Sequence, residues 1–266
     1  MASAPWKISR YQDGAFGPAD VMVVEELPLT LYANGEEVVT LLTLGDNLLE
    51  LALGFLRSEG FFSEREEVLG WEEEPGIVRV RLARDPGLIR KLMEKRTVTT
   101  GCGKGTTFYS ALDALRLRPV ESPLKLSSEA ILARMNDLQQ RSDLYRSTGG
   151  THNATLADED RTLLFRTDIG RHNAVDMISG RALLDGIDCT HAALLTTGRV
   201  SSEILLKVAK MRIGILISRS APTALALRLA EEVGVTVVGY VRGGRFNVYT
   251  HPRRVEGAEH SGGCDE

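Results

Sequence analysis

The chain has 266 residues, of which 43% are hydrophobic and 26% charged, so it is long enough for one large or two modest soluble globular domains. Its net charge of −4 argues against a general nucleic-acid binder, and no apolar run is long enough to cross a membrane. Three scattered cysteines exclude a disulfide framework and the N-terminus lacks the apolar core of a signal peptide, so a cytoplasmic location is expected.

The first hundred residues predict a small α+β unit. Asn34-Gly35 is a strong turn signal for a hairpin, and Asp46 is a candidate cap for a helix that ends at Gly60. A second helix is expected from Asp85-Pro86 to about residue 95. The expected strands are Val21–Val24, Leu27–Tyr32, Glu37–Leu42 and Ile77–Leu82.

A glycine-rich loop with a cysteine follows, in the sequence TVTTGCGKGTT. Three glycines within five residues leave the Cys102 sulfur unshielded, and Lys104 favours its thiolate form. The pattern by itself also suits an incidental cysteine in a surface loop. Helices are expected at Phe108–Leu117 and Ser128–Gln140, with the domain boundary between them. We therefore expect a domain over 1–120, a second domain over 121–255 and a polar tail over 256–266.

Two polar turns belong to the second domain. The first, Ser147–His152, precedes a predicted hairpin that continues to Phe165. The second, Asp168–Asp176, opens a helix that runs to about Leu184. Their histidines have no companions at metal-ligand spacing, so hydrogen bonding or acid–base chemistry is favoured and no metal site is expected.

From residue 191 short apolar runs alternate with helical patterns. This rhythm predicts β-α-β-α-β units and a parallel sheet. Ser201 is the expected cap of the first helix, while Ser220 and Pro222 should open the second. The expected elements are strands at His191–Leu195, Ile213–Ile217 and Val235–Val241, and helices at Ser201–Met211 and Ala221–Val233.

The loops after these three strands should meet at the carboxyl edge of the sheet. They are Thr196–Ser202, Ser218–Pro222 and Arg242–Arg245, and each contains arginine beside glycine or small residues. Backbone N–H groups, hydroxyls and guanidinium groups at such an edge suit an anion. One such loop is weak support, but three at one edge favour an anionic-ligand site over solvated turns.

The motifs STGGTH, DIGRHNAVD, TTGRVSSEILLKVA, SRSAPTALAL and GYVRGGRFNVYTHP resemble, in this order, the pattern of the FdhD/NarQ family. That family consists of accessory sulfurtransferases needed for active formate dehydrogenase. The resemblance implies an α/β protein whose C-terminal α/β/α domain is similar to cytidine deaminase, with a smaller N-terminal α+β domain and a homodimeric state. The deaminase zinc signature of H-x-E with P-C-x-x-C is absent from the sequence.

The resemblance also implies a chemistry. Cys102 would accept sulfur from a cysteine desulfurase as a persulfide and pass it to the molybdenum or tungsten of bis-molybdopterin guanine dinucleotide, the cofactor of the formate dehydrogenase catalytic subunit. GDP should mimic half of this cofactor. From the family motif we expect cofactor-binding residues at Tyr240, Val241, Arg242, Gly243, Gly244, Arg245, Phe246 and Asn247. From the other polar turns we add Arg199, Ser218, Arg219, Ser220, Asp168, Arg171 and His172.

The chain departs from the family pattern at Gly105, where many members carry a second cysteine. A mechanism that uses two thiols of this loop is therefore excluded, and transfer through a single persulfide on Cys102 remains. One alternative is a cofactor-binding chaperone without sulfur transfer. Another is a nucleotide-processing enzyme on a deaminase-like scaffold, which the missing zinc signature weakens.

Overall fold

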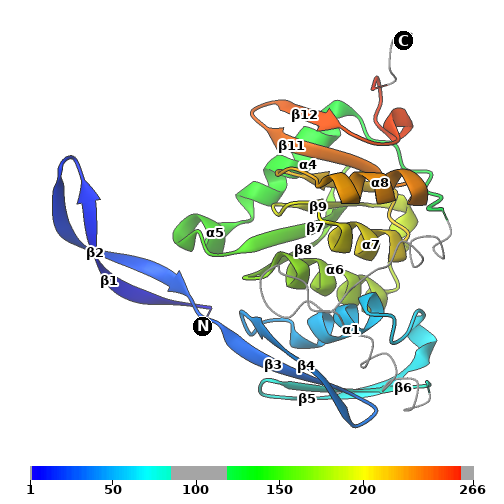
Figure 1. Ribbon diagram of the computed structural model, residues 1–266, viewed down its shortest axis with the longest axis horizontal. Helices are drawn as coiled ribbons and strands as arrows, with labels where there is room; N and C mark the ends of the chain where they lie inside the picture. The colour runs from blue at the N-terminus through cyan, green and yellow to red at the C-terminus, as the bar shows by residue number, and fades with distance from the viewer. Residues whose placement is uncertain (1, 85–118, 259–266) are drawn as a thin grey trace.

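A computed structural model describes residues 2–84 and 119–258. Over these residues the protein is mixed α/β, with a two-stranded, a four-stranded and a six-stranded sheet (Figure 1). The cysteine loop, the helices expected before and after it, and the end of the tail lie outside the described residues. The expected domain boundary near residue 120 therefore stays a prediction. No helix of the described part is long and apolar enough to cross a membrane.

The chain begins with a long hairpin of β1 (Ser3–Gln12) and β2 (Ala15–Val24) that projects from the body (Figure 1). The two strands pair only with each other along their whole length. Both turn residues, Asp13 and Gly14, have positive φ, which suits a two-residue hairpin turn. The sequence predicted only the last four residues of β2, because no long apolar alternation marks β1.

The four-stranded sheet has the order β4-β3-β6-β5, and α1 (Leu48–Ser58) packs against it. The expected hairpin and the strand at Ile77 are confirmed. One detail is wrong: Asn47 rather than Asp46 is the N-cap of α1, and it makes no side-chain cap hydrogen bond. The strands are β3 (Leu27–Ala33), β4 (Glu36–Thr43), β5 (Val68–Glu74) and β6 (Ile77–Leu82).

The six-stranded sheet has the order β12-β11-β10-β9-β7-β8. Its centre, β9 to β11, is parallel as predicted, while β8 and β12 are antiparallel edge strands. The strands are β7 (His152–Ala157), β8 (Thr162–Asp168), β9 (Ala193–Thr196), β10 (Ile215–Ser218), β11 (Thr236–Arg242) and β12 (Arg245–Val248).

Helices cover both faces of this sheet. One face packs against α6, α7 and α8, and the opposite face against α4. These helices are α4 (Ser128–Gln140), α6 (Arg171–Asp185), α7 (Ser202–Lys210) and α8 (Ala224–Val233). The short helices are α5 (Asp143–Thr148), η1 (Arg65–Glu67), η2 (Cys189–His191) and η3 (Pro252–Arg254). The sheet is therefore the middle layer of an α/β/α arrangement.

The helix starts test two predicted caps. Ser201 caps α7, since its side chain accepts a hydrogen bond from the Ile204 amide. The predicted start of α8 at Ala221 is wrong, because Thr223 is the cap and the helix begins at Ala224. The reason is tertiary: Pro222 forms a β-bridge with Val200, which holds this part of the chain extended.

Two glycines join the two larger sheets through their helices. A Cβ atom on Gly54 of α1 would lie 1.8 Å from the carbonyl oxygen of Asp176 in α6. A Cβ atom on Gly180 of α6 would lie 1.9 Å from the carbonyl oxygen of Glu50 in α1. The two helix backbones therefore touch directly, and only glycine fits at these two positions.

Candidate functional site

The three predicted loops lie at the carboxyl edge of the six-stranded sheet, and further segments of the chain lie there too. The loops after β9 and β10 and the end of β11 lie there by the direction of the parallel strands. Because β7 is antiparallel to β9, with Ala154 opposite Thr196, its first residue His152 lies at the same edge. Asp168 at the end of β8 pairs with His152, so the start of α6 lies there too. Five polar segments thus meet at one edge.

Hydrogen bonds tie these loops together. The Ser218 hydroxyl donates to the Gly198 carbonyl at 2.7 Å, and the Arg219 amide donates to the Thr196 carbonyl at 3.1 Å. The Tyr240 amide donates to the Ser220 carbonyl at 3.1 Å. The three predicted loops therefore form one connected surface, which carries the exposed Arg199 and the half-buried Arg219.

The RGGR segment is a hairpin tip rather than an open loop. Gly243 and Gly244 both have positive φ, and they place Arg242 opposite Arg245 on two antiparallel strands. The Arg242 guanidinium lies 5.2 Å from the centre of the Tyr240 ring, in a cation–π arrangement. Tyr240 itself has a φ of 56°, in the left-handed region that is sparsely populated by bulky residues. Strain of this kind is concentrated at functional sites.

The rest of the expected cofactor-binding segment divides into exposed and buried residues. Asn247 is exposed and Phe246 is partly buried against the core beside α4. Val241 is buried in that core, so its side chain does not face this edge. The alternation of β11 and β12 therefore presents the arginines and Asn247 to solvent, while the apolar residues anchor the hairpin.

Among the helices that begin at this edge, α6 is the one whose N-terminal amides have no side-chain cap. Ser201 and Thr223 cap α7 and α8 with their side chains, whereas Gly170 provides no side-chain cap to α6. The Arg171 Nε atom is also buried without a hydrogen-bond partner among the described residues. Uncapped helix amides beside an arginine are a favourable place for a phosphate group. The sequence did not distinguish α6 from the other two helices.

Asp168, one of the expected cofactor-binding residues, makes all its observed hydrogen bonds to protein groups. It is fully buried, and both carboxylate oxygens are occupied. Thr43 and the Leu44 amide donate to Oδ2 at 2.5 and 3.1 Å, and the Gly170 amide and Asn173 donate to Oδ1 at 2.9 and 2.8 Å. It therefore joins the N-terminal sheet to α6. Ser218 is also fully buried, and its hydroxyl connects the loops after β9 and β10.

His152 belongs to this site although the expected binding set did not include it. Its Nδ1 atom lies 3.4 Å from the Thr197 hydroxyl, which also accepts a hydrogen bond from the Asn153 amide. Burial lowers the pKa of His152, and the nearby Arg171 and His172 lower it further. The imidazole is therefore neutral at pH 7. The STGGTH motif was the only signal in the sequence, and it gave His152 no partner.

His172 lies on the other side of the α6 start. Its Nε2 atom is 2.9 Å from a carboxylate oxygen of Glu203, at the start of α7, but without the angle of a hydrogen bond. The contact is therefore electrostatic, and it is attractive when the imidazole is protonated. It links the start of α6 to the start of α7.

The lowered pKa of His152 makes stability depend on pH in a definite direction. Below its ordinary pKa of about 6.5 the unfolded chain binds a proton that the folded chain does not. The stability due to neutral His152 is therefore complete above about pH 6.5 and is lost as the pH falls toward the lower folded pKa. The free energy of unfolding, measured with urea, should fall less between pH 7.5 and pH 5.5 for His152→Gln than for the natural chain. His191→Gln, at an exposed imidazole, should leave the loss unchanged; equal losses in all three proteins would contradict the assignment.

Of the two cysteines that precede the tail, the structure describes Cys189 and not Cys102. Cys102, the predicted catalytic residue, lies outside the described residues. Cys189 is buried, and burial raises the pKa of its thiol to about 11. At pH 8 its thiolate fraction is roughly two orders of magnitude below that of an ordinary cysteine. Cys189 is therefore unsuited to sulfur chemistry.

The fold and this edge define a mixed α/β protein with an arginine-rich surface at the carboxyl ends of parallel strands. The sequence profile of the FdhD/NarQ family matches residues 24–256, which is most of the chain. The chain belongs to the FdhD/NarQ family.

Individual relatives agree with this family. A protein named sulfur carrier protein FdhD from Bacillus subtilis (strain 168) is 44% identical over 248 residues, covering 92% of this chain and 95% of the relative. A protein of the same name from Staphylococcus aureus (strain MRSA252) is 40% identical over 254 residues, covering 95% and 96%. The crystal structure of a protein assigned as a formate dehydrogenase accessory protein from Desulfotalea psychrophila has a TM-score of 0.80 at 27% identity, covering 96% of this chain and all of that chain.

Proposed function

We propose that this protein is a sulfur carrier for formate dehydrogenase, in which Cys102 receives sulfur from a cysteine desulfurase and delivers it to the metal of bis-molybdopterin guanine dinucleotide. The names of the relatives support the sulfur-carrier role in general. The glycine-flanked thiol of Cys102 supports the position of the persulfide, because Cys189 is buried and its thiol pKa is raised. The metal-bearing cofactor is the acceptor, not a resident group of this protein.

The observation that carries the proposal is the meeting of five polar segments at one sheet edge. The acceptor has two pyrophosphates and two guanines, so it needs cationic groups and backbone donors spread over a wide surface. Arg171 beside the uncapped α6, Arg219 beside Ser220, and the Arg242–Arg245 tip supply such groups. Asn247 is the exposed amide at this edge that suits the reading of a guanine.

The second candidate function is a cofactor-binding chaperone without sulfur transfer. The sheet edge favours it as much as it favours the first, since the same arginines would hold the cofactor in both. The two functions differ only at Cys102. A chaperone would need no thiol there, so the Cys102→Ser variant separates them.

GDP should raise the melting temperature of the protein, because any ligand of the native state stabilises it by mass action. At a concentration one hundred times its dissociation constant the gain is about 2.7 kcal/mol. ADP carries the same diphosphate but a different base, so it should give a smaller shift if Asn247 reads the guanine. Thermal unfolding with each nucleotide, repeated on Asn247→Ala, measures this. An equal shift from ADP, or no shift from saturating GDP, would reject this edge as a guanine-nucleotide site.

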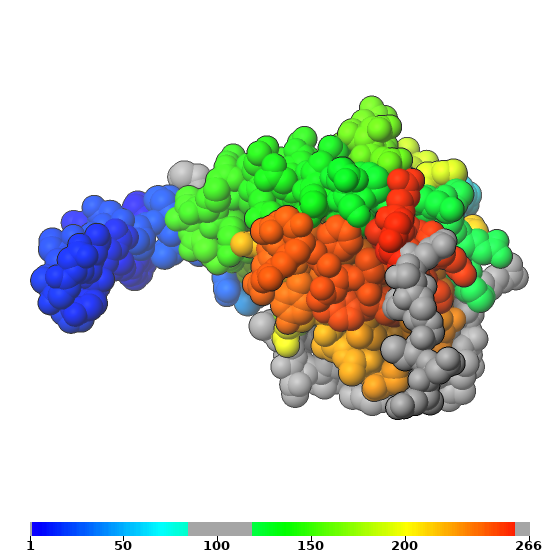
Figure 2. All heavy atoms as spheres, turned by 90° about the horizontal axis from the view of Figure 1, so that it is seen from above, coloured from blue at the N-terminus to red at the C-terminus, as the bar shows by residue number. Residues whose placement is uncertain are grey.

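The proposal includes a homodimer that forms through the β1–β2 hairpin. One face of the hairpin is apolar, with the cross-strand pairs Ala4–Val23, Trp6–Val21 and Ile8–Ala19. Trp6 is 63% exposed, and Figure 2 shows the hairpin extended away from the body. An isolated two-stranded hairpin is only marginally stable in water. A second copy would cover both hairpins through one self-complementary contact.

Light scattering of the full chain should give the mass of a dimer at micromolar concentration. Trp6→Ser should shift the equilibrium to monomer, because it removes the largest side chain of the apolar face. Leu69→Ser, at a leucine of similar exposure on β5, is the matched control and should stay dimeric. A monomeric natural chain, or equal dissociation of both variants, would rule out the hairpin as the dimer contact.

A further inference from the structure

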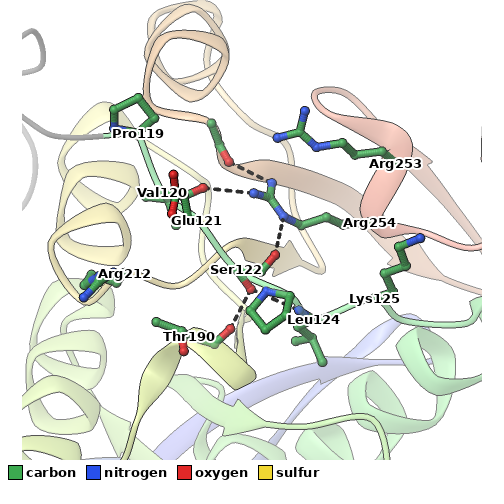
Figure 3. Close-up of a pocket in the computed structure, with 12 residues that line it drawn as sticks. Pro119, Val120, Glu121, Ser122, Leu124, Lys125, Thr190, Arg212, Arg253 and Arg254 are labelled. Carbon is green, nitrogen blue, oxygen red and sulfur yellow. Dashed lines mark hydrogen bonds between the residues drawn. The ribbon is translucent and has the colours of Figure 1, made fainter.

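A pocket lies at the edge of the six-stranded sheet opposite the carboxyl edge described above. It has a volume of about 840 Å³, within the range of small-molecule sites (Figure 3). Arg212 and Gly234 lie before β10 and β11, so this pocket is at the amino ends of those strands, away from the loops described above. Its other lining comes from the 119–125 segment, Thr190 and the η3 helix.

The pocket contains a buried arginine without a carboxylate partner. Arg254 is only 4% exposed. Its guanidinium donates to the carbonyls of Gly234 at 2.7 Å, Val120 at 3.0 Å and Ser122 at 3.5 Å (Figure 3). It also donates to the Thr236 hydroxyl at 3.3 Å. All these acceptors are neutral, and no described acidic residue forms a salt bridge with it. Burial lowers the pKa of Arg254, and the charge of Arg253 lowers it further. Its positive charge is therefore held in place but not neutralised.

More cationic side chains surround this arginine. Lys125, Arg212 and Arg253 are exposed and line the same pocket, whereas Glu121 is its single acidic residue. Asp188 offsets part of the Arg212 charge, since Arg212 contributes to lowering the pKa of that carboxyl. The balance of the pocket is still positive, because Lys125, Arg253 and Arg254 form no ion pair within the described part of the chain.

The backbone conformation around the pocket brings its lining segments close together. Arg212 follows α7 with a φ of 62°, at a position where glycine is the usual residue. Gly214 lets the 119–125 segment approach closely, since a Cβ atom there would lie 2.4 Å from Ser122 Cβ and 3.1 Å from Arg254 Nε. The Ser122 hydroxyl donates to the Thr190 carbonyl at 2.6 Å. These contacts fix the positions of the segments that line the pocket.

We propose that this pocket is a second anion-binding site, which takes a small phosphate-bearing molecule independently of the nucleotide site at the other edge. Lys125 and Arg253 provide donors to the phosphate oxygens, and the buried Arg254 adds a fixed positive potential beneath them. Arginine and lysine both bind phosphate in proteins, the first as a rigid fork of donors and the second as a flexible point charge.

Pyrophosphate titrated into the Arg245→Ala variant by calorimetry at low salt tests the site separately from the nucleotide edge. Binding should persist in this variant and weaken at least tenfold in a variant that also carries Lys125→Gln and Arg253→Gln. Arg228→Gln, which removes one positive charge from an exposed position on α8, should leave the affinity unchanged. GDP binding to the Lys125→Gln/Arg253→Gln protein should match that of the natural chain.

Three results would overturn the inference. The first is no pyrophosphate binding at millimolar concentration to the natural chain. The second is loss of binding in Arg245→Ala alone, which would place pyrophosphate at the nucleotide edge. The third is an equal loss in Arg228→Gln, which would indicate a general charge effect. Because the probe and the Lys125→Gln/Arg253→Gln substitutions differ from those of the GDP experiments, failure here and failure of the proposed function are distinguishable.

Discussion

Replacing Cys102 with serine is expected to abolish persulfide loading by a cysteine desulfurase while leaving GDP binding nearly unchanged. The described cysteine cannot take over, because burial raises the pKa of Cys189 to about 11. The sheet edge is built from β7 to β12 and their loops, and the hydrogen bonds described above connect these loops directly to one another. Formate dehydrogenase matured with this variant should contain metal and pterin but be inactive.

The reciprocal variant is Arg245→Ala. It should still load a persulfide but bind GDP more weakly, because one charge-assisted phosphate contact contributes roughly 1.5–3 kcal/mol, or about ten- to a hundredfold in affinity. A mass measurement for the added sulfur and a GDP titration, each made on both variants and on Cys264→Ser, decide the question. If Cys102→Ser supports fully active formate dehydrogenase, the sulfur-carrier function is wrong and the chaperone function replaces it.

Gly180→Ala is expected to destabilise the whole protein strongly. The added Cβ atom would lie 1.9 Å from the backbone carbonyl of Glu50, which cannot move without shifting α1. Overpacking in a core costs about 1–3 kcal/mol and more where backbone must move, whereas alanine gains at most about 1 kcal/mol in helix propensity. With the upper end of that range we expect a net loss of about 2 kcal/mol, or roughly 4–8 °C in melting temperature for a chain of this size.

Gly54→Ala on the facing helix should have a similar effect, because its Cβ atom would lie 1.8 Å from the Asp176 carbonyl. Asp176 also forms a buried ion pair with Lys207 of α7, so a shift of α6 would disturb a second contact. Gly17→Ala is the matched control, since a Cβ atom there meets nothing within 4 Å. If Gly180→Ala raised the melting temperature, as helix propensity alone predicts, the direct contact between α1 and α6 would be wrong.

Local sequence determined the parallel core and the positions of its polar turns. Strand and helix periodicity are properties of neighbouring residues, so β9 to β11 and the helices between them were predictable to within a few residues. Right-handed crossovers then place the loops of parallel strands at one edge, which is why Arg199, Arg219 and Arg245 could be grouped without a structure. The motifs by themselves were also sufficient to predict the family.

Tertiary structure decided what each polar residue at that edge does. Asp168 looks like a ligand-binding carboxylate in sequence, but its four donors include Thr43 and Leu44, which lie more than a hundred residues earlier in the chain. His152 became part of the site because an antiparallel strand brings it to the end of β9. Such pairings depend on contacts between distant segments, which local patterns do not encode.

The same reason applies to the pocket at the other edge and to the glycine contact. Arg254 lies two residues after Pro252 in an ordinary polar segment, and only the fold buries it among the carbonyls of Val120 and Gly234. Gly54 and Gly180 look like weak points of their helices until α1 and α6 are brought together. Periodicity identifies which face of an element is apolar, but close approach depends on the partner that the completed fold supplies.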